Sequence, residues 1–330
     1  MVLEVFHVKE EDAVRVRHQD LRATTTALFM KVGVPRADAE LATDVLVAAD
    51  LRGVDSHGVS NMLRSYIQGY NEGRLNARPN WRIIRETPST ANIDCDAGLG
   101  IIIGPKAMDI AIDKAKKVGV GIVTMAHGRH MGMASYHAMM ALKHDMIGTC
   151  MTAPGAQVLP TFGALERLGT NPIAVAAPAK EEPPFVFDAA TSTVATNKIQ
   201  LARRLDAVIP AGLIADKDGT PIMEEGKVPA EYKMLPMGSV REQGSHKGYG
   251  LACVVEVLCS VLSGSGFAAM NARGMAQHYV AAYSIEAFTD VEEFKLEIER
   301  RAHGIPLHKE VIQWYDSICG EMDVPRLRTV

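Results

Sequence analysis

Apolar residues recur at helical spacing over the first 70 positions of the chain. The runs 10–33, 34–53 and 60–73 carry apolar side chains three and four positions apart, and each run ends at a glycine. Pro35 falls near the first turn of the second run, where proline is tolerated. The pattern therefore predicts three consecutive helices, with the sequence RGVDSHG in the connection between the second and the third.

From about residue 80 the pattern changes to short apolar runs separated by Gly, Pro and Asn, which is typical of strands. Seven strands are expected, at 81–87, 90–97, 119–126, 146–153, 172–179, 184–191 and 277–285. Further helices are expected at 104–118, 132–145, 196–208, 248–263, 291–304 and 307–322. The order of these elements predicts a mixed α/β body preceded and followed by helices.

Composition narrows the class of protein. The 330 residues are 47% hydrophobic with a net charge of -4, which suits a sizeable core and disfavours a nucleic-acid surface. Five cysteines without close pairs indicate reduced thiols in a cytoplasmic protein. The N-terminus is charged early, unlike a signal peptide, and the apolar run 249–264 is too short to span a membrane and contains Glu256.

A glycine pattern follows the second expected strand. Gly98, Gly100 and Gly104 approach the dinucleotide-binding fingerprint. The next strand, however, ends without the acidic residue that would bind a ribose hydroxyl, and the strand before the glycines is polar. The pattern favours a glycine-started helix that packs on a sheet.

The RGVDSHG connection offers groups for proton transfer and anion binding. His57 is the side chain best suited to moving a proton near neutral pH. Ser56 could orient it, and Arg52 carries a planar guanidinium that suits a carboxylate. Equally, Asp55 or Ser56 could simply cap the next helix and leave His57 exposed.

Two other segments contain candidate groups. His127, His130 and His137 lie close in sequence without an acidic or cysteine ligand, so a histidine lining a pocket is favoured over a metal site. Thr170 and Asn171 form a turn before a strand. That turn could simply connect two elements, or it could direct N–H groups toward a ligand.

Two glycine- and hydroxyl-rich loops precede helices and suit phosphate. The first joins a strand to a helix and contains Asp188, Ala189, Ala190, Thr191 and Ser192. The second contains His246, Lys247 and Gly248. Backbone N–H groups and a lysine at a helix start can bind phosphate, although ordinary helix capping explains the hydroxyls equally well.

The segments DLRGVDSHGV, LGTNPIA, FDAATS, HKGYGL and GIPLHKEV, in this order, resemble the second malate/L-lactate dehydrogenase family, which is unrelated to the Rossmann-type enzymes. The resemblance runs from about 10 to 315. It implies a non-Rossmann, mixed-sheet NAD(P)-binding body at 79–291 and a helical domain formed by the N- and C-terminal segments 1–78 and 292–330. It also implies a homodimer.

The resemblance further implies hydride transfer between NAD, or NADP, and C2 of a small 2-hydroxy or 2-oxo acid. His57 would donate and accept the proton beside Ser56 and His130, and Arg52 would lie near the substrate carboxylate. Thr170 and Asn171 are expected to contact the substrate. The resemblance assigns cofactor contacts to Asp188–Ser192 and to His246, Lys247 and Gly248. It also implies a catalytic role for Asp188, because the matching aspartate takes part in acid-base work with the histidine in the imine-reducing members. We expect Asp188 to raise the pKa of His57.

The chain also departs from the family pattern. Ala153 and Pro154 replace an Asn-Ser pair, and a Pro-Gly-Glu loop that precedes the last helices in the family is missing. Two alternatives therefore stay open beside the dehydrogenase. One is a reductase of cyclic-imine 2-carboxylates, which needs the same hydride and proton, and the other is an inactive binding homologue.

Overall fold

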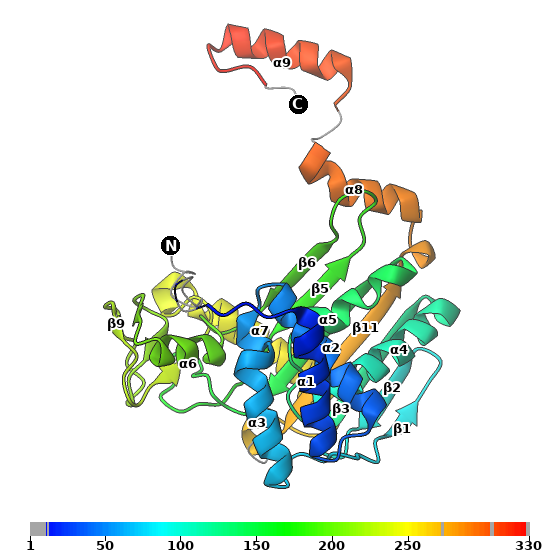
Figure 1. Cartoon of the computed structure of the whole chain (residues 1–330). Helices are drawn as coiled ribbons and strands as arrows, with labels where there is room; N and C mark the ends of the chain where they lie inside the picture. The colour runs from blue at the N-terminus through cyan, green and yellow to red at the C-terminus, as the bar shows by residue number, and fades with distance from the viewer. Residues whose placement is uncertain (1–10, 12, 272–273, 304–306, 328–330) are drawn as a thin grey trace.

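A seven-stranded mixed sheet forms the centre of the computed structural model, which describes residues 11, 13–271, 274–303 and 307–327 (Figure 1). Its strands, in spatial order, are β1 (Arg82–Glu86), β2 (Thr90–Asp94), β3 (Val120–Gly128), β11 (Ala276–Ser284), β4 (Met146–Pro154), β5 (Ile173–Ala177) and β6 (Phe185–Ala189). Among them β2 and β3 pair in parallel and the other neighbours are antiparallel. The expected strands and the mixed α/β fold are confirmed.

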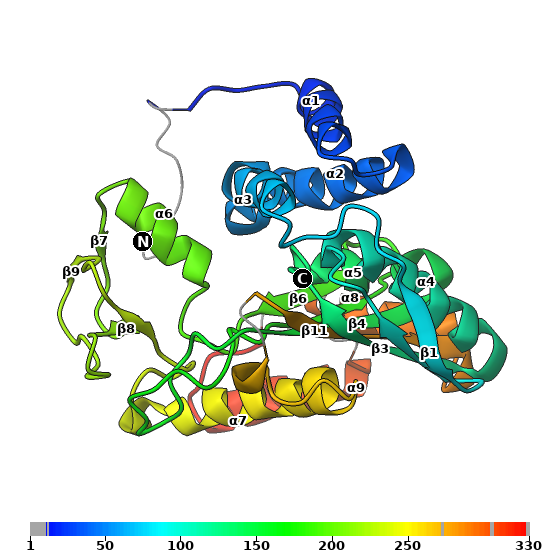
Figure 2. The same cartoon turned by 90° about the horizontal axis from the view of Figure 1, so that it is seen from below.

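Helices cover both faces of this sheet (Figure 2). On one face lie α4 (Gly100–Val118) and α5 (Ala134–Met139), over a core that includes Ile93, Met125 and Val280. On the other lies α7 (Ser245–Val255), which continues into a π-helical turn, η6 (Glu256–Val261). The strands therefore bury both faces near the centre of the sheet, which explains their nearly continuous apolar runs.

The β2–α4–β3 unit explains the glycine pattern. Gly100 begins α4, and a Cβ at this position would lie 2.7–2.9 Å from backbone atoms of 129–131. Glycine is therefore needed because the helix start and the segment after β3 approach closely. The interpretation as a helix that packs on a sheet is confirmed.

Three N-terminal helices pack beyond α4. They are α1 (His18–Lys31), α2 (Arg36–Leu51) and α3 (Val59–Asn71), and they share a core with the start of α4. The first helix was expected from residue 10 but begins at His18. Val14 and Val16 are 88% and 63% exposed, so no packing supports a helix there.

Residues 191–245 form a small substructure beside the sheet. It contains α6 (Thr196–Arg204) and the short strands β7 (Val208–Ile209), β8 (Ile214–Ala215), β9 (Gly226–Lys227) and β10 (Lys233–Met234). Its Ile199 and Met234 belong to a separate buried cluster, to which Val158 from the segment after β4 also contributes. Asp206, in the left-handed conformation with a φ of 51°, follows the end of α6, which is shorter than expected.

The C-terminal helices extend from the far end of the β5–β6 hairpin (Figure 1). They are α8 (Val291–His303) and α9 (Lys309–Glu321), and α9 lies apart from the body, beyond α8. Within this chain α9 does not lie beside α1–α3, so a helical domain of 1–78 plus 292–330 stays a prediction. Part of the GIPLHKEV segment lies outside the described residues.

No helix in the described part of the chain combines the length and the apolar character that a membrane crossing requires. All five cysteines are free thiols, and four of them are buried.

Candidate active site

The candidate residues lie at one end of the strands, where β2, β3, β4 and β6 all finish. The pairings make β2, β3, β4 and β6 run in the same direction, so Asp94, Gly128, Pro154 and Ala189 end at one edge. In open α/β sheets, ligands bind beyond the carboxyl ends of the strands. The connection between α2 and α3 lies against this edge through its contacts with the segment that follows β3.

The RGVDSHG connection forms a short 3₁₀ turn, η3 (Asp55–His57), as expected for a helix-to-helix connection. Asp50 lies in the last turn of α2, and its carboxylate accepts a 2.9 Å hydrogen bond from the Val59 N–H at the start of α3. A Cβ on Gly58 would overlap this carboxylate. The expectation that Ser56 or Asp55 caps α3 is therefore wrong, because Gly58 leaves the capping position open to Asp50.

Ser56 instead contacts the histidine beside it. Its Oγ lies 2.9 Å from His57 Nδ1, and its backbone carbonyl accepts a 2.8 Å hydrogen bond from the Asn197 amide on α6. Ser56 is buried and His57 is half-buried, with its ring enclosed between Ser56 and His130. The contact occupies Nδ1 and leaves Nε2 as the ring nitrogen available to a substrate.

His57 stacks on His130. Their ring centroids lie 5.6 Å apart with an interplanar angle of 11°. His130 Nδ1 accepts a 3.2 Å hydrogen bond from the Gly132 N–H and lies 2.6 Å from the Tyr66 hydroxyl on α3. Because a backbone N–H can only donate, neutral His130 carries its proton on Nε2.

Both histidines favour the neutral form. Burial, and to a smaller extent the charge of Lys198 on α6, lowers the pKa of His57 to about 4. Burial, followed by His57 and His278, lowers the pKa of His130 to about 3. The pair is therefore neutral at pH 7 in the free protein, with Nε2 of His57 suited to accept a proton and Nε2 of His130 suited to donate a hydrogen bond.

Asp188 was expected to act on His57, but its hydrogen-bond partner lies at the start of α5. Its carboxylate accepts a 2.7 Å hydrogen bond from the Ser135 N–H at the start of α5. Burial raises the pKa of Asp188, and the hydrogen bond opposes that rise. The expectation that Asp188 raises the pKa of His57 is wrong, because burial and Lys198 set the pKa of His57 below its usual value.

The two loops expected to bind phosphate lie together. The Met237 N–H donates to the Thr191 carbonyl at 2.8 Å, and Ser192 bridges to Pro236. A Cβ on Gly248 would lie 2.4–2.8 Å from the Met237 backbone, so the start of α7 packs on the same loop. Segments more than 50 residues apart thus meet at one place, with His246 and Lys247 exposed beside them.

The loop hydroxyls donate to nearby backbone carbonyls. Thr191 Oγ1 donates to the Thr170 carbonyl at 3.2 Å, and Ser192 Oγ donates to the Val194 carbonyl at 2.7 Å. Asn171 is fully buried, and its amide donates to the Ala252 carbonyl and to Glu256. Asn171 therefore attaches its turn to α7 and η6, and Thr191 attaches the Asp188–Ser192 loop to that turn.

The other candidates lie apart from the histidine pair. Arg52 is the exposed C-terminal cap of α2. His127 is exposed beside Asp94 at 3.2 Å, and buried His137 contacts the Met131 carbonyl at 2.9 Å. These histidines face different partners, and no cluster of metal-ligating side chains occurs among the described residues.

Sequence reasoning missed three residues of this site, namely Tyr66, Asn197 and Lys198. Tyr66 lies nine positions after His57, on α3, whereas Asn197 and Lys198 lie 140 and 141 positions after His57. Helical spacing could place Tyr66 on the buried face of α3. No sequence signal could bring α6 to the histidines, because their contact is made only by the packing of two distant segments.

Comparisons with known proteins agree on one family. A family model described as malate/L-lactate dehydrogenase matches residues 16–313. The chain is 40% identical to a malate dehydrogenase of Pyrococcus abyssi over 292 residues, which cover 87% of this chain and 80% of that protein. It is 38% identical to an L-sulfolactate dehydrogenase of Methanocaldococcus jannaschii over 280 residues, 82% of this chain and 78% of that protein.

A solved structure shows the same fold. The malate dehydrogenase of Pyrococcus horikoshii OT3 superposes with a TM-score of 0.79 at 35% identity, covering 97% of this chain and 99% of that chain. The similarity therefore extends over the sheet, the N-terminal helices and the loops described above.

Proposed function

Because the chain belongs to the malate/L-lactate dehydrogenase family, we propose that it transfers a hydride between a nicotinamide cofactor and C2 of a small 2-hydroxy or 2-oxo acid. NAD is the proposed cofactor, with NADP as the alternative. The observation that carries this proposal is the stacked pair of neutral histidines, each with its Nδ1 occupied and its Nε2 available.

We assign the proton transfer of the reaction to Nε2 of His57. In the oxidation direction, neutral His57 accepts the proton of the substrate hydroxyl while the hydride leaves C2. In the reduction direction, protonated His57 returns that proton to the forming alkoxide. His130, as a neutral Nε2–H donor, would hydrogen-bond the same oxygen, and Ser56 would hold the His57 ring.

A cation is needed to bind the substrate carboxylate. Lys198 adds positive charge close to His57. Arg52 stays the proposed anchor on its planar guanidinium and on the resemblance, although its side chain lies apart from the histidine pair. A bound carboxylate would in turn raise the pKa of His57 and favour the protonated form needed for reduction. Contacts of Thr170 and Asn171 with substrate remain part of the proposal, through the turn they form rather than through the buried Asn171 amide.

The paired loops fit a dinucleotide. Exposed His246 and Lys247 lie at the start of an eleven-residue helix, where a cation and the helix N-terminus suit a pyrophosphate. Asp188 and Ala189 end β6 and Ala190 follows it, so two small side chains stand at this end of the strand. Gly248 lets α7 approach Met237, whose N–H in turn donates to the Thr191 carbonyl. When bound, the nicotinamide would supply and accept the hydride.

A spectrophotometric panel tests the proposal. The protein is mixed with NADH or NADPH and with 2-oxo acids, including oxaloacetate, pyruvate and sulfopyruvate, and the loss of nicotinamide absorbance is followed. Turnover with at least one acid is expected. Piperideine-2-carboxylate in the same panel distinguishes the reductase of cyclic imines, and absence of turnover together with absent cofactor binding by calorimetry would identify an inactive homologue.

Replacement of His57 tests the assigned proton donor. We expect His57→Ala to lower kcat at least 100-fold, the usual range for loss of a general acid-base group, while the Kd for NADH changes little. The matched control is His127→Ala, an exposed histidine at the end of β3. Activity retained in His57→Ala would contradict the assignment.

We further propose that the enzyme is a cytoplasmic homodimer that binds neither nucleic acid nor membrane. The net charge of -4 and the five free thiols support this environment.

A further inference from the structure

The turn η3, which carries His57, is held by a helix that lies far from it in the sequence. On α6 the Asn197 amide donates to the Ser56 carbonyl at 2.8 Å, and Ser56 Oγ lies 2.9 Å from His57 Nδ1. The same amide lies 3.2 Å from Met62 Sδ on α3. Asn197 therefore holds the residue that in turn holds the His57 ring.

A second contact from α6 leads to the other carbonyl of this turn. Arg204, the last residue of α6, donates to Asn61 Oδ1 at 3.0 Å, and Asn61 Nδ2 donates to the Asp55 carbonyl at 2.7 Å. Both ends of α6 are thus attached to the connection between α2 and α3. A movement of α6 would therefore move the turn or break these hydrogen bonds.

Helix α6 is also close in sequence to the loop suited to the cofactor. It begins four residues after the Asp188–Ser192 loop, to which dinucleotide contacts were assigned. Between the two, Thr193 Oγ1 donates to the Leu213 carbonyl at 2.7 Å, and the Thr193 N–H donates to the Leu235 carbonyl at 3.0 Å. Because so short a hydrogen-bonded segment has little freedom, the position of the loop determines the position of Asn197.

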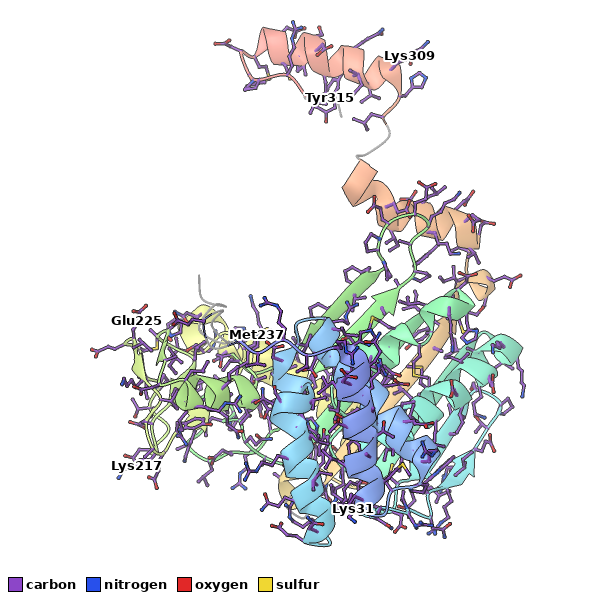
Figure 3. The ribbon with its side chains drawn as sticks, viewed as in Figure 1. Lys31, Lys217, Glu225, Met237, Lys309 and Tyr315 are labelled. Atoms are coloured by element: carbon purple, nitrogen blue, oxygen red, sulfur yellow. The ribbon has the colours of Figure 1, made fainter. Side chains whose placement is uncertain are left out.

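The arrangement of the 191–245 substructure agrees with this path. Helix α6 is the part of it that faces the N-terminal helices (Figure 2), and α6 contacts η3 directly. Figure 3 shows Lys217 and Glu225 on the outer side of the substructure, away from α3. The substructure therefore reaches the RGVDSHG connection through α6.

We propose that Asn197 is a positioning residue, through which a dinucleotide bound at the Asp188–Ser192 loop orders the turn that carries His57. The inference rests on the proposed cofactor binding at that loop and adds the path by which the cofactor prepares the residue for proton transfer. Cofactor and 2-oxo acid should therefore bind cooperatively, and each should raise the affinity for the other by the same factor.

Hydrogen exchange of the full chain, read by mass spectrometry with and without ADP-ribose, tests this path. ADP-ribose contains the pyrophosphate but no nicotinamide, so it occupies the loop without covering the His57 ring. It should slow exchange of the backbone N–H groups of 54–59 by about fivefold or more. In Asn197→Leu this protection should be lost, while the Kd for ADP-ribose, measured by calorimetry, should change by less than about twofold.

Two further variants separate the hydrogen bond from general damage to α6. Asn197→Asp keeps the shape of the side chain but cannot donate to the Ser56 carbonyl, so it should lose the protection as well. It also takes the place of Asn197→Leu if that chain does not fold. The matched control is Gln200→Ala, an exposed position on the same helix, which should keep the protection.

Turnover supplies a second readout. The kcat of Asn197→Leu should fall about tenfold, the equivalent of one hydrogen bond, with little change in the Kd for NADH. A kcat equal to that of Gln200→Ala would contradict the positioning role.

The outcomes of the exchange experiment are distinct. Protection of 54–59 that persists in both Asn197 variants would overturn the proposal, and so would ADP-ribose that binds the protein without protecting this segment. Absence of ADP-ribose binding would contradict the proposed cofactor site, and the coupling with it. Because exchange is measured without turnover, failure of the Asn197 path is distinguishable from failure of the proposed reaction.

Discussion

At the scale of single residues, the environment of His57 determines what this histidine can do. Ser56 occupies Nδ1, and His130 stacks on the ring. Burial, and to a smaller extent Lys198, lowers the pKa of His57 to about 4. A base with a low pKa is fully available at neutral pH but is a weak acceptor, so substrate binding has to raise that pKa for efficient proton transfer.

The first prediction concerns Lys198. Oxidation requires neutral His57, so kcat/KM for oxidation should be constant near pH 7 and fall as the pH drops through the pKa of His57 in the free enzyme. Removal of the positive charge in Lys198→Met should raise that pKa and move the fall to higher pH. The pH profile of kcat/KM measures this shift. The control is Lys217→Met, which lies on a distant loop. Identical profiles for Lys198→Met and Lys217→Met would exclude this role of Lys198.

The second prediction concerns Tyr66, which we regard as a positioning residue for His130. Tyr66→Phe removes the 2.6 Å contact with Nδ1 and leaves the Gly132 N–H as the remaining partner. Loss of one such hydrogen bond, worth about 1–1.5 kcal/mol, should reduce kcat about tenfold. Steady-state kinetics should show this loss mainly in kcat, with little change in the cofactor Kd; a change confined to stability would contradict a role in orienting His130.

At the scale of elements, the start of α3 is organised by Asp50 from the preceding helix. Helix capping from a residue nine positions away is not visible in a local motif, because Ser56 and Asp55 stand closer to the helix start and have equally good side chains. The absence of a Cβ at Gly58 decides in favour of Asp50. The arrangement ties the end of α2 to the start of α3 on either side of His57.

The third prediction tests this connection. Asp50→Ala should lower the free energy of unfolding by about 1 kcal/mol, the usual cost of a lost cap, and should lower kcat because His57 lies in the connection. Thermal or denaturant unfolding and steady-state kinetics measure the two effects. Glu40→Ala, an exposed position on the same α2, is the control. An Asp50→Ala variant as stable and active as this control would argue against the cap.

Most elements could be predicted from their periodicity, and the differences have local reasons. The strands follow the apolar runs because the sheet is covered on both faces. Helix α1 begins later than expected because Val14 and Val16 find no surface to cover. The Gly98–Gly104 pattern was assigned correctly to packing, since Gly100 lets the start of α4 approach the backbone around His130.

At the scale of the whole molecule, buried histidines connect stability with pH. His137 and His278 are fully buried, and burial lowers their pKa values to about 4 and about 3, from 6.5. His278 contacts Thr152 Oγ1 at 2.7 Å and the Arg129 carbonyl at 3.0 Å, and so links β11, β4 and the segment before His130.

The fourth prediction follows from these lowered values. Between pH 6.5 and 3 the unfolded chain binds more protons at these two sites than the folded chain, so stability falls as the pH falls through this range. Each of the two histidines should lower the free energy of unfolding at pH 5 by about 2 kcal/mol relative to its value at pH 8. Denaturant unfolding at several pH values measures the slope, and His278→Gln should reduce it; an unchanged slope in that variant would contradict the assignment to His278.

The sequence by itself determined the strands, the helix pattern, the family resemblance and the identity of His57 as the candidate proton carrier. These features depend on local spacing and on short motifs, which can be recognised without knowing how the chain packs. The tertiary structure decided which nitrogen of each histidine is available, which residue caps α3, that α6 brings Asn197 and Lys198 to the RGVDSHG connection, and that the two loops suited to phosphate meet at Met237. These features depend on contacts between residues far apart in the chain, whose partners no local pattern identifies.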